Sequence, residues 1–191
     1  METKQVKSIA VGVTGASGAI YAVRTIAALL ERGCQVDVVV SEFGRRLLRD
    51  ELGESAAIGV LETYLRDTYG STIGNGTIRI HSNKDVGATI ASGSYACAGM
   101  VIVPCSMKTL AGVAHGLSRN LVERAADVVL KEHRRLVLVP RETPMSLPQL
   151  KNLVSCCEAG AVVLPAMPAF YQRPRTLDDL ADFMAGKILS A

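Results

Sequence analysis

Residues 8–18, SIAVGVTGASG, join an apolar strand pattern to a glycine-rich turn, and a helical pattern follows at once at Ala19–Arg32. A strand is expected over Ser8–Thr14, and the glycines after it permit a tight turn with outward-facing amide groups. Such amides favour an anion, because they stand at the positive end of the helix dipole. The stretch therefore predicts a phosphate-binding turn after a first parallel strand, although a turn of this kind can also serve only to pack helix on strand.

Five further strand patterns follow, and most are short and apolar without alternation, as in parallel strands buried on both faces. They are Gln35–Val40, Thr77–His81 (the weakest), Met100–Pro104, Leu136–Pro140 and Ala161–Leu164. Helical patterns occupy Phe43–Leu52, Lys108–His115, Asn120–Glu132, Pro148–Glu158 and Leu177–Leu189. The alternation predicts a single doubly wound, Rossmann-like α/β/α domain over residues 1–191, with a mostly parallel six-stranded sheet.

Two late helices carry clear start signals. Ser146 with Gln149, and Thr176 with Asp179, each have the spacing of a capping box. The segment Gly70–Gly76 is expected to be a surface loop.

The composition excludes several kinds of partner. The 191 residues hold 21 Lys and Arg against 18 Asp and Glu, with no basic run and no tryptophan, so no footprint for nucleic acid is visible. No apolar stretch reaches the roughly 18 residues that would span a bilayer. The cysteines have no C-x-x-C spacing, which favours reduced thiols and a cytoplasmic protein; they are Cys34, Cys97, Cys105, Cys156 and Cys157.

A nicotinamide dehydrogenase is an alternative for the first turn. The short-chain members of that class need a tyrosine with a lysine four residues later, and none of the five tyrosines has one. Glu42 follows the second strand pattern and offers a carboxylate for a ribose hydroxyl. The dinucleotide interpretation therefore stays open as the second choice.

A second polar turn, Cys105–Thr109, leads from the strand pattern at Met100–Pro104 into a helical pattern. If that strand lies beside the first at the topological switch point, both turns face one crevice. Together with three later motifs, these turns resemble the UbiX-type flavin prenyltransferases nearly end to end. The motifs are TGASG at 14–18, PCSMKT at 104–109, NLVERAAD at 120–127, RETP at 141–144 and PAMPAFY at 165–171.

The resemblance implies a homo-oligomeric FMN protein, commonly a dodecamer, with flavin sites near subunit contacts. It assigns FMN binding to Gly15, Ala16, Ser17, Ser41, Ser106, Met107, Lys108, Thr109 and Arg141. It assigns the prenyl phosphate to Tyr171, Lys187, Arg124, Lys131 and Arg141, and catalysis to Ser17, Glu142, Lys131, Arg124 and Glu51. Lys187 departs from the arginine usual in the family, so it keeps the charge without the two-pronged guanidinium.

The implied reaction joins a dimethylallyl group from dimethylallyl phosphate to N5 and C6 of reduced FMN, without a metal ion. The product, prenylated FMN, is the cofactor of UbiD-type decarboxylases. Two rivals remain: a flavin-dependent peptidyl or pantothenoyl cysteine decarboxylase, and a non-catalytic FMN-binding module. The decarboxylase normally has Asn where this chain has Pro168, and a tryptophan that this chain lacks.

Without the family, the same charged residues allow plainer interpretations. Arg124 and Lys131 are seven apart on one helical face and offer two charges to one anion, or simply form a solvated face. The Arg141-Glu142 pair at a strand end is either a ligand site or an ordinary exposed pair. Asp178, Asp179 and Asp182 match the D-D-x-x-D metal motif of prenyl synthases, but their place at a helix start favours capping.

The cysteine and histidine residues suggest no further site. Cys105 lies in the second turn, where a helix start could lower its pKa, and we assign it no catalytic role. The histidines lack the spacing of a zinc site and are expected to pack or to lie at the surface; they are His81, His115 and His133.

Overall fold

Six strands form one sheet in the computed structural model, which describes residues 6–191. Their order across the sheet is β3-β2-β1-β4-β5-β6, and every neighbouring pair is parallel. The strands are β1 Ser8–Val13, β2 Gln35–Val40, β3 Thr77–Ser82, β4 Cys97–Cys105, β5 Arg135–Pro140 and β6 Val162–Val163. The predicted α/β class is confirmed, and the sheet is wholly rather than mostly parallel over these residues.

Alternate residues of the central strands point into two apolar cores. Val11, Val38 and Val101 belong to the core on one face of the sheet, whereas Ala10 and Val39 belong to the core on the other. Because both faces are covered, the strands consist of apolar runs without a polar side.

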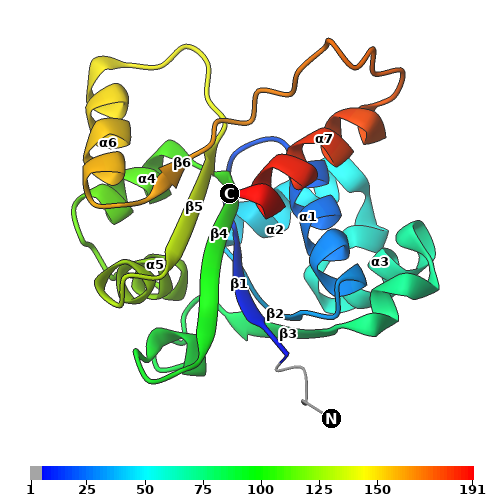
Figure 1. Cartoon of the computed structure of the whole chain (residues 1–191), viewed down its shortest axis with the longest axis horizontal. Helices are drawn as coiled ribbons and strands as arrows, with labels where there is room; N and C mark the ends of the chain where they lie inside the picture. Colours follow the sequence, from blue (N-terminus) through cyan, green and yellow to red (C-terminus); the bar gives the residue numbers. More distant parts are fainter. Residues whose placement is uncertain (1–5) are drawn as a thin grey trace.

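Helices cover both faces of this sheet (Figure 1). One layer contains α1 Ala19–Glu31, α2 Glu42–Leu52, α3 Leu61–Tyr69 and α7 Leu177–Ser190. The other contains α4 Met107–Ala114, α5 Leu121–Lys131 and α6 Leu147–Glu158. Figure 1 shows α4, α5 and α6 on one side of the central strands and α1, α3 and α7 on the other.

The topological switch point lies at β1. Strand β2 flanks it on one side and β4 on the other, so the chain builds outward first in one direction and then in the opposite one. The loops that leave β1 and β4 therefore diverge to opposite faces, which opens a crevice at their carboxyl ends. The sequence predicted this arrangement for its two polar turns.

The segment between β2 and β3 differs from the predictions. Leu61–Tyr69 forms helix α3. The expected surface loop at Gly70–Gly76 is mostly exposed, but its residues Ser71–Asn75 form a 3-10 helix. Helix α3 buries only Leu61 and Leu65, so its sequence has too little apolar periodicity to predict a helix. Ile73 is buried as well, and it anchors the short helix to the core.

Both predicted capping boxes are confirmed. The amide of Ser146 donates to Gln149 Oε1 at 2.7 Å. Asp179 accepts from the Thr176 amide at 2.9 Å, and its own amide donates to Thr176 Oγ1 at 3.1 Å. Across residues 6–191, no helix combines the length and apolar character that a bilayer crossing requires.

A buried carboxylate ties the strands on one side of the sheet together. Asp37 of β2 is fully buried and accepts hydrogen bonds from the hydroxyls of Ser8 and Tyr95, at 2.8 and 2.7 Å. The side-chain amide of Gln35 donates to the same carboxylate oxygen at 3.2 Å, and His81 Nε2 lies 2.8 Å from the other carboxylate oxygen. Burial by itself raises the pKa of Asp37, but these hydrogen bonds, above all that with His81, hold it below its usual range.

Candidate functional site

The turn after β1 depends on two glycines. Gly18 precedes α1 with a φ of 117°, a left-handed backbone that favours glycine. A Cβ at Gly15 would stand 2.5 Å from Cβ of Phe43, so the start of α2 approaches the turn closely. Gly15 and Ser17 are exposed while Ala16 between them is buried. The turn thus presents the Ser17 hydroxyl and adjacent backbone at the edge of the sheet.

Thr14 joins this turn to the one that follows β4. Its hydroxyl donates to the Pro104 carbonyl at 2.9 Å and accepts from the Ser106 amide at 2.7 Å. The Thr14 amide also donates to the Pro104 carbonyl, at 3.2 Å. Thr14 is 1% exposed, so little water competes for these bonds. The two turns therefore form one wall of the crevice.

The β4–α4 turn presents hydroxyls and free amides. Ser106 caps α4, since its Oγ accepts from the Thr109 amide at 3.3 Å and donates to Thr109 Oγ1 at 3.1 Å. Within residues 6–191, the amides of Met107 and Lys108 donate to no protein acceptor. Met107 is buried and Lys108 is exposed. This helix start is open to an acceptor from outside the chain.

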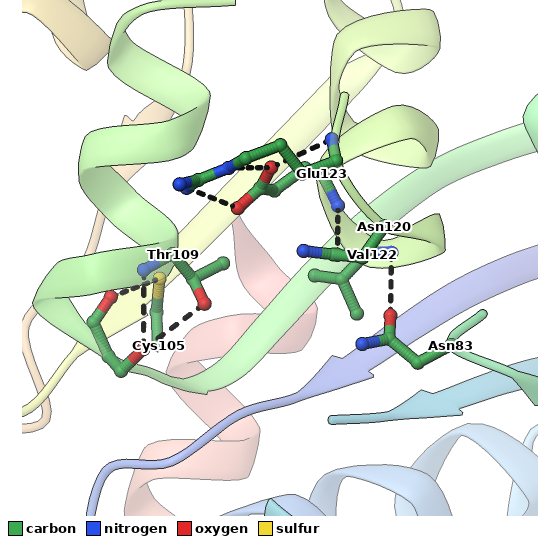
Figure 2. Close-up of polar contacts among 8 residues, drawn as sticks. Asn83, Cys105, Thr109, Asn120, Val122 and Glu123 are labelled. Atoms are coloured by element: carbon green, nitrogen blue, oxygen red, sulfur yellow. Dashed lines mark hydrogen bonds and ion pairs between the residues drawn. The ribbon is translucent and has the colours of Figure 1, made fainter. Parts of the chain in front are cut away.

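Cys105 lies directly beneath this helix start (Figure 2). Its side chain is fully buried, and burial raises the pKa of the thiol above its usual range. The suggestion that a helix start lowers this pKa is therefore wrong, because desolvation outweighs the helix dipole at a buried position. A buried thiol whose pKa is raised is a poor nucleophile.

Arg141, the residue after β5, lies at the same edge of the sheet as the two turns. Its Nε donates to the Ser17 carbonyl at 3.1 Å, so the guanidinium reaches across β4 to the first turn. Glu142 is partly exposed, and its carboxylate accepts from the Thr143 amide at 3.0 Å. The structure thus brings Ser17 and Arg141 together, with Glu142 next along the chain.

Helix α2 supplies two predicted residues with defined local partners. Ser41 caps the helix, because its Oγ accepts from the Gly44 amide at 3.1 Å. Glu51 accepts from the amides of Gly18 and Ala19, at 2.9 and 2.7 Å. A carboxylate therefore already occupies the first amides of α1, whereas the start of α4 holds no such group in the described chain.

The start of α5 is held by a residue from the loop after β3 (Figure 2). The Asn83 carbonyl accepts from the Leu121 amide at 2.9 Å, and its Oδ1 accepts from the Val122 amide at 3.1 Å. The next residue along the helix, buried Glu123, accepts from Arg119 Nη2 at 2.9 Å. These contacts fix the end of α5 that lies near the crevice edge.

The two predicted cations of α5 point to different ends of the sheet. Arg124 is near the start of the helix, and its Nη1 lies 3.1 Å from Asp127 Oδ2. Lys131 is the last residue of α5, with its Nζ 3.3 Å from Glu132 Oε1. Because β5 begins at Arg135, Lys131 lies at the amino end of the sheet, opposite the two turns. Within one chain, Lys131 and Arg124 do not converge on one anion.

Tyr171 and Lys187 do meet, in a hollow of about 730 Å³ between residues 169–175 and α7. The Tyr171 ring stands edge-on to Phe183 with ring centroids 6.2 Å apart. Lys187 Nζ lies 5.8 Å from the centre of the same Phe183 ring. The two residues that the resemblance assigns to the prenyl phosphate therefore share one cavity.

Two of the aspartates in the first turns of α7 serve the fold. Asp179 accepts from the amides of Arg175 and Thr176, and these bonds hold the pKa of its carboxyl below the usual range. Asp182 forms an ion pair with Arg24 of α1. The capping interpretation of Asp179 is confirmed. Nowhere in the described chain do three or more His, Cys, Asp or Glu side chains gather as metal ligands.

The donors at the crevice edge fit FMN. A flavin mononucleotide needs donors for a doubly charged phosphate and for the polar edge of a flat ring. The edge offers exposed backbone at Gly15 and Ser17, hydroxyls at Ser106 and Thr109, and the Arg141 guanidinium. Among residues 6–191, Glu51 supplies the one carboxylate that is hydrogen-bonded to the β1 turn.

Three features of the edge and the hollow were missed by sequence reasoning. Thr14 belongs to the TGASG motif, but its bridging role becomes apparent only once β1 is known to pair with β4. Asn83 follows a strand end, where an Asn often serves as a cap, and that position was the available signal. Arg173 and Arg175 also line the hollow, and their place on either side of Pro174 beyond Tyr171 could have marked them.

Comparisons with known proteins identify the family. A model of the Flavoprotein family matches residues 1–188. The flavin prenyltransferase UbiX of Halalkalibacterium halodurans is 47% identical, over 94% of this chain and 85% of the relative. That of Methanothermobacter thermautotrophicus is 41% identical, over 97% and 90% of the two chains.

Solved structures give the same result. A crystal structure of AnUbiX (PadA1) with FMN and dimethylallyl pyrophosphate has a TM-score of 0.86 and 35% identity, covering 97% of this chain and 92% of that one. A dodecameric FMN-dependent Ubix-like decarboxylase from Escherichia coli O157:H7 has a TM-score of 0.83 and 38% identity, covering 96% and 92%.

Proposed function

This chain belongs to the Flavoprotein family, as one of its flavin prenyltransferases, and we propose that it joins a dimethylallyl group from dimethylallyl phosphate to N5 and C6 of reduced FMN. The observation that carries the proposal is the Thr14 bridge, which makes the β1 and β4 turns one wall of donors. Arg141 extends that wall from β5. Bound FMN supplies the nucleophilic N5 and the ring carbon C6.

The proposed FMN site follows from where donors are free. The open start of α4 and the exposed backbone of the β1 turn suit the phosphate, because amides and hydroxyls there have spare donor capacity. Arg141, held against Ser17, suits the ring edge. The residues proposed to bind FMN are Gly15, Ala16, Ser17, Ser41, Ser106, Met107, Lys108, Thr109 and Arg141.

The proposed catalytic groups lie beside this wall. Ser17 is exposed next to Arg141, so its hydroxyl can hold a proton or an oxygen of the reacting groups. Glu142 is solvent-accessible, as a carboxylate that accepts and returns a proton must be. Glu51 sits at the other side of the Ser17 turn, on the Gly18 and Ala19 amides.

The prenyl phosphate needs cations, because charge develops on the leaving group. Tyr171 and Lys187 supply a hydroxyl and an ammonium in one hollow. Arg124 and Lys131 complete the proposed set with Arg141. Since Lys131 lies at the amino end of its own sheet, we propose that a second copy of the chain brings it to a neighbouring crevice.

Assembly and downstream use are part of the same proposal. The dodecameric Escherichia coli relative, at 38% identity, supports a homo-oligomer and a dodecamer as its size. We propose that the product, prenylated FMN, is delivered to a UbiD-type decarboxylase. A cytoplasmic site suits five cysteines that are all unpaired, and one sheet with two cores suits a single FMN domain over residues 1–191.

The test is to incubate the protein with FMN, reduced by dithionite under anaerobic conditions, and dimethylallyl phosphate, and to measure the mass of the extracted flavin. We expect a gain of one prenyl unit and release of phosphate. Ser17→Ala and Glu142→Gln should each keep FMN but lower kcat on the order of 10² to 10⁴ fold, because both handle protons. Ser55→Ala and Glu158→Gln, at exposed positions elsewhere, serve as matched controls. Unmodified flavin from the unaltered protein would refute the activity, and normal turnover in both variants would refute the residue roles.

A further inference from the structure

The position of Arg124 depends on the first turn of α5. Its amide donates to the Asn120 carbonyl at 2.9 Å, which is the first backbone hydrogen bond of the helix. Asn120 also caps the helix, because its Oδ1 accepts from the Glu123 amide at 3.1 Å. These bonds join residues of one short segment, so they shape the start of the helix but do not fix its place in the fold.

Asn83 fixes that place from a distant part of the chain (Figure 2). It is the residue after β3, and it uses both its main chain and its side chain. Its carbonyl accepts from the Leu121 amide at 2.9 Å, and its Oδ1 accepts from the Val122 amide at 3.1 Å. The loop after β3 is thereby joined to the first two residues of α5, although Asn83 and Val122 are 39 residues apart in sequence.

The starts of α4 and α5 therefore offer an anion different groups. All four amides that a helix start usually leaves without a partner are paired at α5. At α4, the amides of Met107 and Lys108 donate to no acceptor within residues 6–191. What α5 offers is the side chain of Arg124. In the described chain this guanidinium donates to Asp127 through Nη1, so its remaining N–H groups are available to a ligand.

The Asn83 side chain is not easily replaced by water. Val122 is 1% exposed, so loss of Asn83 Oδ1 leaves the Val122 amide without an acceptor in a buried place. The first turn of α5 must then shift or open to reach a new partner, and Arg124 moves with it. A shift of about 1 Å in a group that stabilises a leaving phosphate can cost on the order of 10² fold in rate.

We propose that Asn83 is a positioning residue for prenyl transfer, which holds the first turn of α5 where Arg124 meets the leaving phosphate. The inference rests on the proposed function of the chain. Asn83 acts through Arg124 and touches neither the flavin nor the prenyl donor. Its effect on turnover therefore depends on the presence of the Arg124 guanidinium.

The first experiment measures kcat with reduced FMN and dimethylallyl phosphate. Asn83→Ala should lower kcat about tenfold and leave FMN affinity unchanged, because the proposed FMN donors lie on other turns. Asn83→Asp should restore kcat to within about threefold, since a carboxylate also accepts at a helix start. Asn75→Ala is the matched control and should keep kcat. It removes a single side-chain bond as well, from Asn75 Nδ2 to the Glu31 carbonyl at 3.2 Å.

The second experiment repeats the substitution in an Arg124→Gln background. Asn83→Ala should then lower kcat by less than about twofold, because the group that Asn83 positions is already absent. A residue that only stabilises the fold would cause the same loss in both backgrounds. If Asn83→Ala does not fold, Asn83→Gln serves in both backgrounds, because it keeps the amide but displaces its oxygen.

A third measurement does not depend on turnover. Protein loaded with oxidised FMN cannot transfer the prenyl group, so calorimetry gives its affinity for dimethylallyl phosphate. Asn83→Ala should weaken this affinity about fivefold in the unaltered background and by less than about twofold beside Arg124→Gln. Unchanged kcat in Asn83→Ala, no recovery in Asn83→Asp, or an equal loss in both backgrounds would overturn the inference and leave the proposed function standing. If the unaltered protein makes no prenylated flavin, the proposed function fails and the inference with it.

Discussion

The two regions proposed to bind anions in this protein are built in opposite ways. At the crevice edge the donors are backbone amides and short hydroxyls, and Thr14 ties the turns that carry them to each other. In the hollow beside α7 the donors are long side chains on an exposed segment, where Tyr171 is 74% exposed. The first region is fixed by the sheet, while the second depends on side chains that substitution can change at little cost to the fold. We expect such a division to let the fold keep its flavin while the donor varies.

The largest effect is expected at Thr14, because the edge depends on its hydroxyl. Thr14→Val leaves the Ser106 amide without an acceptor in a buried place, so we expect a loss of about 2 to 3 kcal/mol in the free energy of unfolding. FMN affinity should fall as well, by about tenfold or more. Urea unfolding and fluorescence titration of FMN measure the two quantities.

Thr68→Val is the matched control, since Thr68 is exposed on α3. Should Thr14→Val bind FMN as tightly as the unaltered protein, the edge would not be the rigid region that we describe.

An intermediate effect is expected at Asp37, which joins β1, β2 and β3 away from the crevice edge. Asp37→Asn replaces a carboxylate that accepts from Ser8, Tyr95 and Gln35, and should cost about 2 kcal/mol at pH 7. Since the pKa of Asp37 is lowered in the folded state, its contribution is present above the unfolded pKa near 4 and is lost as pH falls through the folded value.

Urea midpoints at pH 7 and pH 3 test this. The difference in stability between the unaltered protein and Asp37→Asn should shrink at the lower pH. Asp50→Asn, at an exposed ion pair, should show almost no difference at either pH. A difference in stability between the unaltered protein and Asp37→Asn that grows toward pH 3 would contradict the assigned direction of the pKa shift.

The smallest effect is expected at Lys187, in the exposed hollow. Lys187→Met should raise KM for dimethylallyl phosphate about fivefold with FMN affinity unchanged, because an exposed charge is partly screened by water. Lys187→Arg should restore or improve KM. If Lys187→Met lowers the melting temperature and leaves KM alone, Lys187 is a cation at a helix end and no part of the phosphate site.

Sequence patterns predicted most of the architecture, because the buried strands and capped helices carry strong local signals. β2 matched its expected bounds, and Ser146 and Thr176 began their helices as expected. Helix α3 was not predicted because only two of its residues, both leucines, are buried. β6 is only two residues long, whereas four were expected, because the residues that follow it leave the sheet toward Tyr171.

Sequence reasoning proposed residues for the site but gave little of its geometry. The meeting of the two turns followed from the switch point. Tyr171 and Lys187 share a hollow, and the resemblance assigns both residues to the prenyl phosphate. The separation of Arg124 from Lys131 could not be read from their spacing, since a shared helical face says nothing about which end of the sheet each residue reaches.

The Thr14 bridge also bears on the order of events during synthesis. Thr14 and Pro104 are 90 residues apart in the chain, so the ribosome must release more than half of the protein before the two turns can meet. Closing so long a loop carries an entropic cost that only the completed β1–β4 pairing offsets. A nascent chain that stops before Ser106 therefore has no complete crevice, and capture of the flavin is a late event that reports on a finished sheet.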